Sequence, residues 1–161
     1  YLPNQKNVAF NHTGRKTNQA FNLPRDLDIF KDLVNIPFER GTWSVLEEPK
    51  PTNPIFRVKS LSSAFYVIAS LEKKKKGCKY LFLQNSRNEI VEELSSNLLF
   101  LKGDTLYTPK LDSGAVVGVT LRYILATYSG ETFEANITEG IIASYDAIYI
   151  CKGTTGITRI A

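Results

Sequence analysis

The sequence has few of the residues that support common hydrolytic and metal chemistry. Its 161 residues include one histidine and two cysteines, and methionine is absent. A Ser-His-Asp or Cys-His hydrolase would have to use His12 as its base, and we expect this residue to lie in a solvated polar loop. Cys78 and Cys151 adjoin apolar runs without a CxxC or histidine-rich spacing, which argues against a zinc site. We expect two buried free thiols and no bound metal.

Long apolar runs and glycine-rich nucleotide signatures are missing as well. No apolar run approaches the roughly 18 residues of a membrane span, and we expect no signal peptide. Neither GxGxxG nor GxxxxGK[ST] occurs. The net charge of +4 is mildly basic, and the dense basic run 73–76 is typical of a solvated helix end rather than of a nucleic-acid contact. We therefore expect a cytoplasmic protein that binds neither nucleic acid nor a membrane.

The apolar residues that are present predict interleaved strands and helices. Helical spacing covers 29–34, 60–76 and 119–126, with Gly77 and Gly118 at helix ends. Strand-like runs cover 8–10, 80–83, 89–91, 98–102, 106–108, 133–136, 147–151 and 157–160, and a brief helix begins at 137–140. The segment 37–54, rich in proline and charge, predicts a long connecting loop. This order of elements predicts a mixed α/β (α+β) fold.

Lys59 is the first candidate for covalent chemistry. It follows the strand-like stretch 56–58 and directly precedes the helix predicted over 60–76. Against an apolar helix its amine would be desolvated, which favours the neutral form, and a neutral amine can attack an aldehyde. An ordinary surface lysine is the alternative.

Two acids and two glycine turns are further candidates. Alternate residues of a strand face opposite sides, so we expect one of Glu92 and Glu93 to point inward, where a pyridinium nitrogen could be its cationic partner. The alternative is a solvent-facing acidic pair. The start of the helix at Gly118 could bind an anion through its N–H groups and the Thr120 hydroxyl, and the loop 153–156 offers two more hydroxyls. Ordinary polar turns are the alternative for both.

Taken in order, these elements resemble the class IV aminotransferases, which are fold type IV pyridoxal-phosphate enzymes. The matching segments are Lys59-Ser-Leu, Glu92 with Ser95-Ser96-Asn97, the Leu-Tyr-Thr-Pro of 106–109, the Gly-Val-Thr of 118–120, and 146–158. The family includes branched-chain and D-amino-acid aminotransferases and aminodeoxychorismate lyase. The resemblance implies that 36–161 form the pseudo-barrel-like C-terminal cofactor domain and that 1–35 are a tail of the N-terminal domain and a linker.

The resemblance also implies roles for single residues. Lys59 would form the Schiff base with pyridoxal 5'-phosphate and move a proton during the reaction. Glu92, rather than Glu93, would hold the pyridine nitrogen, because this placement puts Asn97 at the spacing of the family. The remaining expected cofactor contacts are Ser95 and Ser96 near the ring, Val116 against one ring face, and Val119, Thr120, Gly153 and Thr154 at the phosphate.

The chain departs from the family pattern at four positions and in its extent. Glu93 replaces a glycine, Leu121 an arginine, Gly153 a phosphate-binding threonine, and Arg159 a proline. A one-residue shift would let Thr154 supply the missing hydroxyl. We expect most of the N-terminal domain of the family, and its C-terminal helix, to be missing from this sequence.

The function implied by the resemblance is transfer of an amino group between an amino acid and a 2-oxo acid by a homodimeric enzyme. Two alternatives remain. One is a pyridoxal-phosphate elimination of the aminodeoxychorismate lyase type. The other is a catalytically inactive fragment that only mediates protein association, which Leu121, Gly153 and the shortened N-terminal domain favour.

Overall fold

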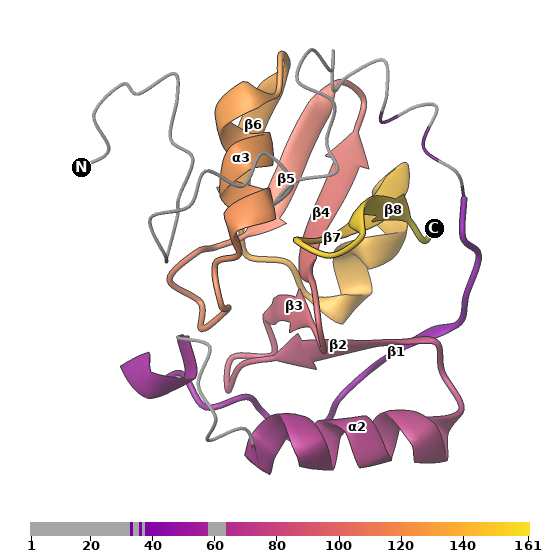
Figure 1. Ribbon diagram of the computed structural model, residues 1–161, viewed down its shortest axis with the longest axis vertical. Helices are drawn as coiled ribbons and strands as arrows, with labels where there is room; N and C mark the ends of the chain where they lie inside the picture. The colour runs from indigo at the N-terminus through magenta and orange to yellow at the C-terminus, as the bar shows by residue number, and fades with distance from the viewer. Residues whose placement is uncertain (1–32, 34–35, 37, 58–63) are drawn as a thin grey trace.

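The computed structural model describes residues 33, 36, 38–57 and 64–161. Lys59, His12, the strand predicted at 8–10 and the start of the helix predicted over 60–76 lie outside the described residues, and of the helix predicted at 29–34 only Leu33 is described. The described chain combines helices with two sheets, which confirms the mixed α/β prediction (Figure 1).

The fold has four layers, in which two sheets lie between two helices (Figure 1). Helix α2 (Ala64–Lys76) covers a three-stranded sheet of β1 (Trp43–Val45), β2 (Tyr80–Gln84) and β3 (Ile90–Glu93). Helix α3 (Val119–Thr127) covers a five-stranded sheet in the order β6 (Glu131–Ala135), β5 (Thr105–Pro109), β4 (Asn97–Lys102), β7 (Ala147–Lys152) and β8 (Gly156–Arg159). Two 3-10 helices, η1 (Pro54–Arg57) and η2 (Glu139–Ser144), connect elements.

Side-chain alternation explains why the sheets are buried on both faces. In β4, Leu98 and Phe100 belong to the core between the sheets, whereas Leu99 and Leu101 belong to the core under α3. In β2, Tyr80 and Phe82 likewise face the core between the sheets, while alternate leucines face α2. Because both faces are apolar, these strands have the continuous hydrophobic runs that predicted them from the sequence.

The β3–β4 turn carries the chain from one sheet into the other. The Glu93 and Ser96 backbones bond each other across this turn, at 2.9 Å from the Glu93 N–H to the Ser96 carbonyl and 3.1 Å in the opposite direction. The tight turn places the end of β3 and the start of β4 at one corner between the two sheets. Glu92 and Asn97, five residues apart in the sequence, are therefore held at this corner.

Three predictions about the fold need correction. The segment 37–54 is not all loop, because it contains β1, which pairs in parallel with β2 and stacks Trp43 on Phe82 with ring centroids 5.1 Å apart. A three-residue strand is too short for its alternation to be recognised without its partner. The stretch predicted as strand-like at 56–58 is helical where it is described, because Phe56 and Arg57 belong to the 3-10 helix η1. The brief helix predicted after 137 is confirmed as the 3-10 helix η2. Cys151 is a buried free thiol, but the free thiol of Cys78 is only half-buried.

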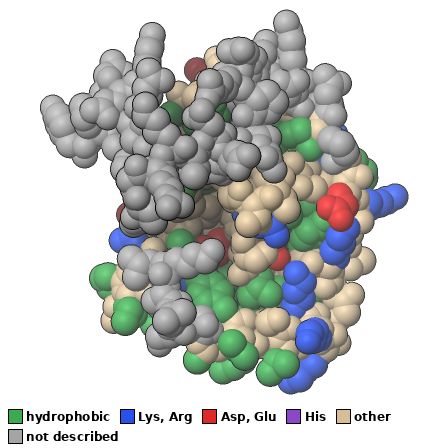
Figure 2. All heavy atoms as spheres, in the orientation of Figure 1, with side chains coloured by type: hydrophobic (Ala, Val, Ile, Leu, Met, Phe, Trp, Pro, Cys, Tyr) green, Lys and Arg blue, Asp and Glu red, His purple; other side chains and the backbone are tan. Residues whose placement is uncertain are grey.

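The surface of α2 combines an apolar face with a charged end. Val67, Ile68 and Leu71 are more than half exposed, and Figure 2 shows apolar side chains along the lower edge of the view, where α2 lies. At the C-terminal end of the helix, lysines of the basic run pair with Glu72, Glu93 and Glu47.

Among the described residues, no helix is long and apolar enough to cross a membrane, and no cluster of three histidine, cysteine or acidic residues could hold a metal ion.

Candidate functional site

Glu92, at the end of β3, is a buried carboxylate with three hydrogen-bond donors. The residue is 4% exposed. Its Oε1 accepts hydrogen bonds from the Lys50 ammonium at 2.6 Å and from the Tyr66 hydroxyl at 2.8 Å, and its Oε2 accepts one from the Val116 backbone N–H at 2.9 Å. Donors from three separate segments therefore fix the position of this carboxylate.

Lys50 is a part of the site that the sequence did not reveal. Its side chain is as buried as that of Glu92, and its ammonium also donates to the Gly114 carbonyl at 2.5 Å and lies 5.4 Å from the centre of the Tyr66 ring. The backbone N–H of Lys50 donates to the Gln84 carbonyl at 2.7 Å, at the end of β2. Lys50 was missed because it lies in the segment predicted as a loop, 42 residues from its partner, and no local pattern distinguishes it from a surface lysine.

Tyr66, on α2, was also missed, because its position in a helical repeat is typical of a core residue. Burial, followed by the negative charge and the hydrogen bond of Glu92, raises the pKa of the Tyr66 phenol above its usual value. The hydroxyl is therefore protonated at neutral pH and remains a donor to Glu92.

Glu93 has a different environment, although it is the next residue and is equally buried. Its Oε2 accepts hydrogen bonds from the backbone N–H of Ser95 at 2.8 Å and from the Ser95 hydroxyl at 3.0 Å, and its Oε1 lies 3.4 Å from the Lys73 ammonium. The expectation that only one of the two acids points inward was wrong, because the β3–β4 turn provides Glu93 with its own donors. Glu93 and the Ser95 hydroxyl are engaged with each other, so Glu92 is the acid that connects to the rest of the site.

Asn97, the first residue of β4, joins the Glu92 end of the site to the start of α3. Its side-chain amide donates to the Val116 carbonyl at 2.8 Å, and its side-chain oxygen accepts the Gly118 N–H at 3.0 Å. Gly118 is the N-cap residue of α3. A Cβ atom on Gly118 would lie 2.5 Å from the Asn97 side-chain oxygen, so any other residue here would displace the Asn97 side chain from its two hydrogen bonds. The segment 114–118 is thus bonded to Lys50, Glu92 and Asn97.

The N-terminal turn of α3 contains a polar atom that no described residue satisfies. The Thr120 hydroxyl is buried and has no hydrogen-bond partner among the described residues. A Cβ atom on Gly153, in the β7–β8 turn, would lie 3.9 Å from this hydroxyl, so that turn approaches α3 here. The first N–H groups of a helix also lack acceptors within the helix. A hydroxyl and helix N–H groups in one place form a suitable anion site.

The other predicted cofactor contacts are placed as follows. Ser96 carries a second buried hydroxyl without a partner among the described residues. Val116 enters the network through its backbone, and Val119 is half exposed at the start of α3. Gly153 and Thr154 lie exposed in the turn after β7. Lys59 lies outside the described residues.

Together these residues form a site with two chemically different ends. One end holds the buried Glu92 carboxylate, and the other holds the Thr120 hydroxyl at the start of α3, with segment 114–118 bonded between them. A ligand with a basic ring nitrogen at one end and an anionic group at the other is complementary to this arrangement.

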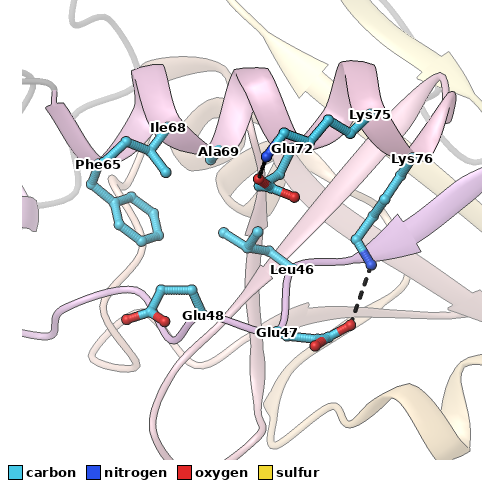
Figure 3. A pocket seen from close by; sticks show the side chains of 9 residues that line it. All are labelled: Leu46, Glu47, Glu48, Phe65, Ile68, Ala69, Glu72, Lys75 and Lys76. Carbon is cyan, nitrogen blue, oxygen red and sulfur yellow. Dashed lines mark hydrogen bonds and ion pairs between the residues drawn. The ribbon is translucent and has the colours of Figure 1, made fainter.

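A separate groove lies between α2 and the segment that follows β1 (Figure 3). Its floor is apolar, and its rim carries the Lys76–Glu47 ion pair, 3.5 Å between charged atoms, and the Lys75–Glu72 ion pair. It is lined by Leu46, Glu47, Glu48, Phe65, Ile68, Ala69, Glu72, Lys75 and Lys76. None of the described residues predicted to contact a cofactor lines this groove, so we do not assign the site to it.

Comparison with protein families gives one match that covers most of the chain. The sequence model described as Amino-transferase class IV matches residues 24–161. No curated protein matches the sequence.

Solved structures share the fold at low sequence identity. A putative 4-amino-4-deoxychorismate lyase from Legionella pneumophila is 22% identical, with a TM-score of 0.70 over 78% of this chain and 48% of that chain. Branched-chain aminotransferases from Thermobaculum terrenum, in a PLP form, and from Thermoproteus uzoniensis are 21% and 20% identical, with TM-scores of 0.69 and 0.64. The match to the Thermobaculum terrenum enzyme covers 77% of this chain and 43% of that chain. The match to the Thermoproteus uzoniensis enzyme covers 78% of this chain and 46% of that chain. This chain thus spans less than half the length of these proteins, and the likeness shows the fold of fold type IV enzymes.

Proposed function

Because the chain belongs to the class IV aminotransferase family, we propose that residues 36–161 form a domain that binds pyridoxal 5'-phosphate. The complete protein then transfers an amino group between an amino acid and a 2-oxo acid. The observation that carries this proposal is a continuous hydrogen-bond network that begins at the buried Glu92 carboxylate and ends at the start of α3. It passes through Val116, Asn97 and Gly118. At the start of α3 the Thr120 hydroxyl has no hydrogen-bond partner among the described residues.

The residues at both ends of the site fit this cofactor. A phosphate would supply the acceptor that the buried Thr120 hydroxyl lacks, and the absence of a side chain on Gly153 leaves room beside that hydroxyl. At the other end, Glu92 is a buried carboxylate whose Oε2 accepts a single protein donor, so it can accept a ring N–H. The cofactor carries both groups, a ring nitrogen in the pyridine ring and a phosphate on a side arm of that ring.

Each residue then has a defined task. Thr120 and the N–H groups at the start of α3 would bind the phosphate, and Glu92 would keep the ring nitrogen protonated. The residues that would border the cofactor are Val116, Ser96 and the exposed turn at Gly153 and Thr154. Lys59 would hold the cofactor through a bond from its amine to the aldehyde carbon, with release of water, and would hold the proton that moves to or from the substrate carbon. When bound, the cofactor supplies an electron sink for bond breaking at that carbon.

Labelling of Lys59 tests the proposal. Pyridoxal phosphate is added to the complete protein, visible absorbance is recorded, borohydride is added, and the modified lysine is identified by peptide mass spectrometry. We expect one adduct, on Lys59, and its loss in Lys59→Ala. The matched control is Lys74→Ala, at the exposed end of α2, which should keep the adduct. Absence of an adduct, or equal labelling of surface lysines, would contradict the proposal.

The products distinguish the remaining alternatives. Amino transfer to a 2-oxo acid identifies a transaminase, whereas pyruvate released from aminodeoxychorismate identifies a lyase. An adduct on Lys59 without either product would favour an inactive fragment that only mediates association. The resemblance to the family also supports a homodimer, which light scattering of the purified protein would test. Fractionation of the source cells would test the expected cytoplasmic location.

A further inference from the structure

Lys50 already forms an ion pair with Glu92, the carboxylate that would bind the ring nitrogen of the cofactor in the proposed function. The distance from its ammonium to Glu92 Oε1 is 2.6 Å, and both side chains are buried. The Tyr66 hydroxyl bonds to the same oxygen, so Oε1 has two donors and Oε2 has one. A carboxylate has about four acceptor positions, so only one is left for a ligand.

Charge is a stronger restriction than the number of acceptors. Glu92 and Lys50 form a neutral buried pair, and a protonated ring nitrogen would bring a second cation to the same carboxylate. Two cations that share one buried anion repel each other where water screens poorly. The ring nitrogen and the Lys50 ammonium are therefore alternative partners of Glu92.

The position of Lys50 in the fold allows its side chain to leave. Its backbone N–H is held by Gln84. The residues on both sides of it, 47–49 and 51–55, are exposed. A four-carbon side chain anchored in an exposed segment reaches solvent by rotating its own bonds, and an ammonium group is strongly hydrated there.

We propose that Lys50 is a tethered counter-ion of Glu92, and that binding of pyridoxal phosphate displaces its ammonium into solvent. This inference rests on the proposed function. Before the cofactor binds, Lys50 keeps the buried carboxylate paired, and part of the binding free energy of the ring nitrogen is used to replace it. Lys50 thus stabilises the empty site and lowers its affinity for the cofactor.

The first experiment measures the affinity for pyridoxal phosphate by absorbance titration. Lys50→Met keeps the length of the side chain and removes its charge, and we expect its dissociation constant to fall at least about tenfold. Lys50→Arg keeps the charge and should bind like the unmodified protein. The matched control is Lys73→Met, which removes the cation beside the neighbouring acid, Glu93, and should leave the affinity unchanged.

A cofactor analogue locates the effect at the ring nitrogen. Pyridoxal phosphate in which carbon replaces that nitrogen cannot pair with Glu92, so Lys50→Met should not improve its binding. An equal gain for both compounds would overturn the proposal, because Lys50 would then act elsewhere in the site.

A second experiment uses the unmodified protein and does not depend on the folding of a variant. Acetic anhydride labels exposed amines, and mass spectrometry reports the labelling rate of each lysine. Lys50 should react slowly in the cofactor-free protein and at least about fivefold faster after loading with pyridoxal phosphate and borohydride reduction. Lys79, which is exposed and paired with Glu39, is the internal control and should not change.

The outcomes separate this inference from the proposed function. An adduct on Lys59, together with unchanged affinity in Lys50→Met and unchanged protection of Lys50, overturns the displacement alone. Weaker binding by Lys50→Met, with Lys50 still protected, also overturns it, because Lys50 would then support the cofactor. Absence of cofactor binding in both the unmodified protein and Lys50→Met overturns both proposals.

Discussion

The two ends of the candidate site differ in how their polar groups are satisfied. At the Glu92 end, one carboxylate accepts hydrogen bonds from an ammonium, a phenol and a backbone N–H. At the Thr120 end, a buried hydroxyl has no partner among the described residues. The charge at the first end is already balanced by Lys50 without a ligand, whereas the second end has an unmet hydrogen bond. In our proposal a ligand therefore exchanges partners at Glu92, but only adds a partner at Thr120.

The largest expected effect is at the Glu92 end. Glu92→Gln removes the charge and leaves the Lys50 ammonium buried without a counter-ion, which should lower the free energy of unfolding by about 3–5 kcal/mol. Urea denaturation of the cofactor-free protein measures this loss of unfolding free energy. The control is Glu47→Gln, which breaks the Lys76 pair at a side chain that is 94% exposed and should have no measurable effect. Equal losses in the two variants would show that Lys50 is hydrated in solution.

The second-largest loss of stability is expected at Gly118, which connects the two ends of the site. Gly118→Ala places a methyl group against the Asn97 side-chain oxygen and breaks its bond to the Gly118 N–H, at a cost of about 1–3 kcal/mol. Gly140→Ala is the matched control, because a Cβ atom there meets nothing within 4 Å. Thermal denaturation compares the stability of the Gly118→Ala and Gly140→Ala variants. A stability loss in Gly140→Ala as large as that in Gly118→Ala would mean that the close approach to Asn97 is not the cause.

A smaller effect, opposite in sign for stability and for binding, is expected at the Thr120 end. Thr120→Val removes the unpaired hydroxyl at nearly constant volume, so the cofactor-free protein should keep its stability or gain up to about 1 kcal/mol. The same change should weaken pyridoxal phosphate binding about tenfold, because one hydrogen bond to the phosphate is lost. Thr120→Ser keeps the hydroxyl and should bind normally. A less stable Thr120→Val protein would imply a protein partner for the hydroxyl.

The smallest effect concerns alkaline pH. Burial raises the pKa of Tyr66, Tyr128, Tyr145 and Tyr149, and Glu92 raises that of Tyr66 further. In the unfolded chain these phenols ionise near pH 10, so their contribution to stability is complete below about pH 10 and is lost as the pH rises above it. Urea denaturation between pH 8 and about 11 should show this decline, and Tyr66→Phe should reduce its slope. An unchanged slope would mean that Tyr66 ionises as an ordinary phenol.

Local patterns in the sequence predicted most of the fold. The apolar runs of β2, β4 and β7, the end of α2 at Gly77 and the start of α3 at Gly118 all lie where the patterns indicated. These features could be predicted because periodicity and glycine conformation act over a few residues. Strand β1 could not, because its three residues are ordered by pairing with β2, which lies more than thirty residues further along the chain.

The sequence by itself determined the family motifs and the order of the elements. Its resemblance to the family predicts Glu92, rather than Glu93, as the acid that pairs with the ring nitrogen. Only the tertiary structure decided that both acids are buried, that Glu93 bonds within its own turn, and that Lys50 pairs with Glu92. The physical reason is that periodicity shows which face of an element is apolar. An ion pair depends on which distant segments the packed layers bring within about 3 Å of each other.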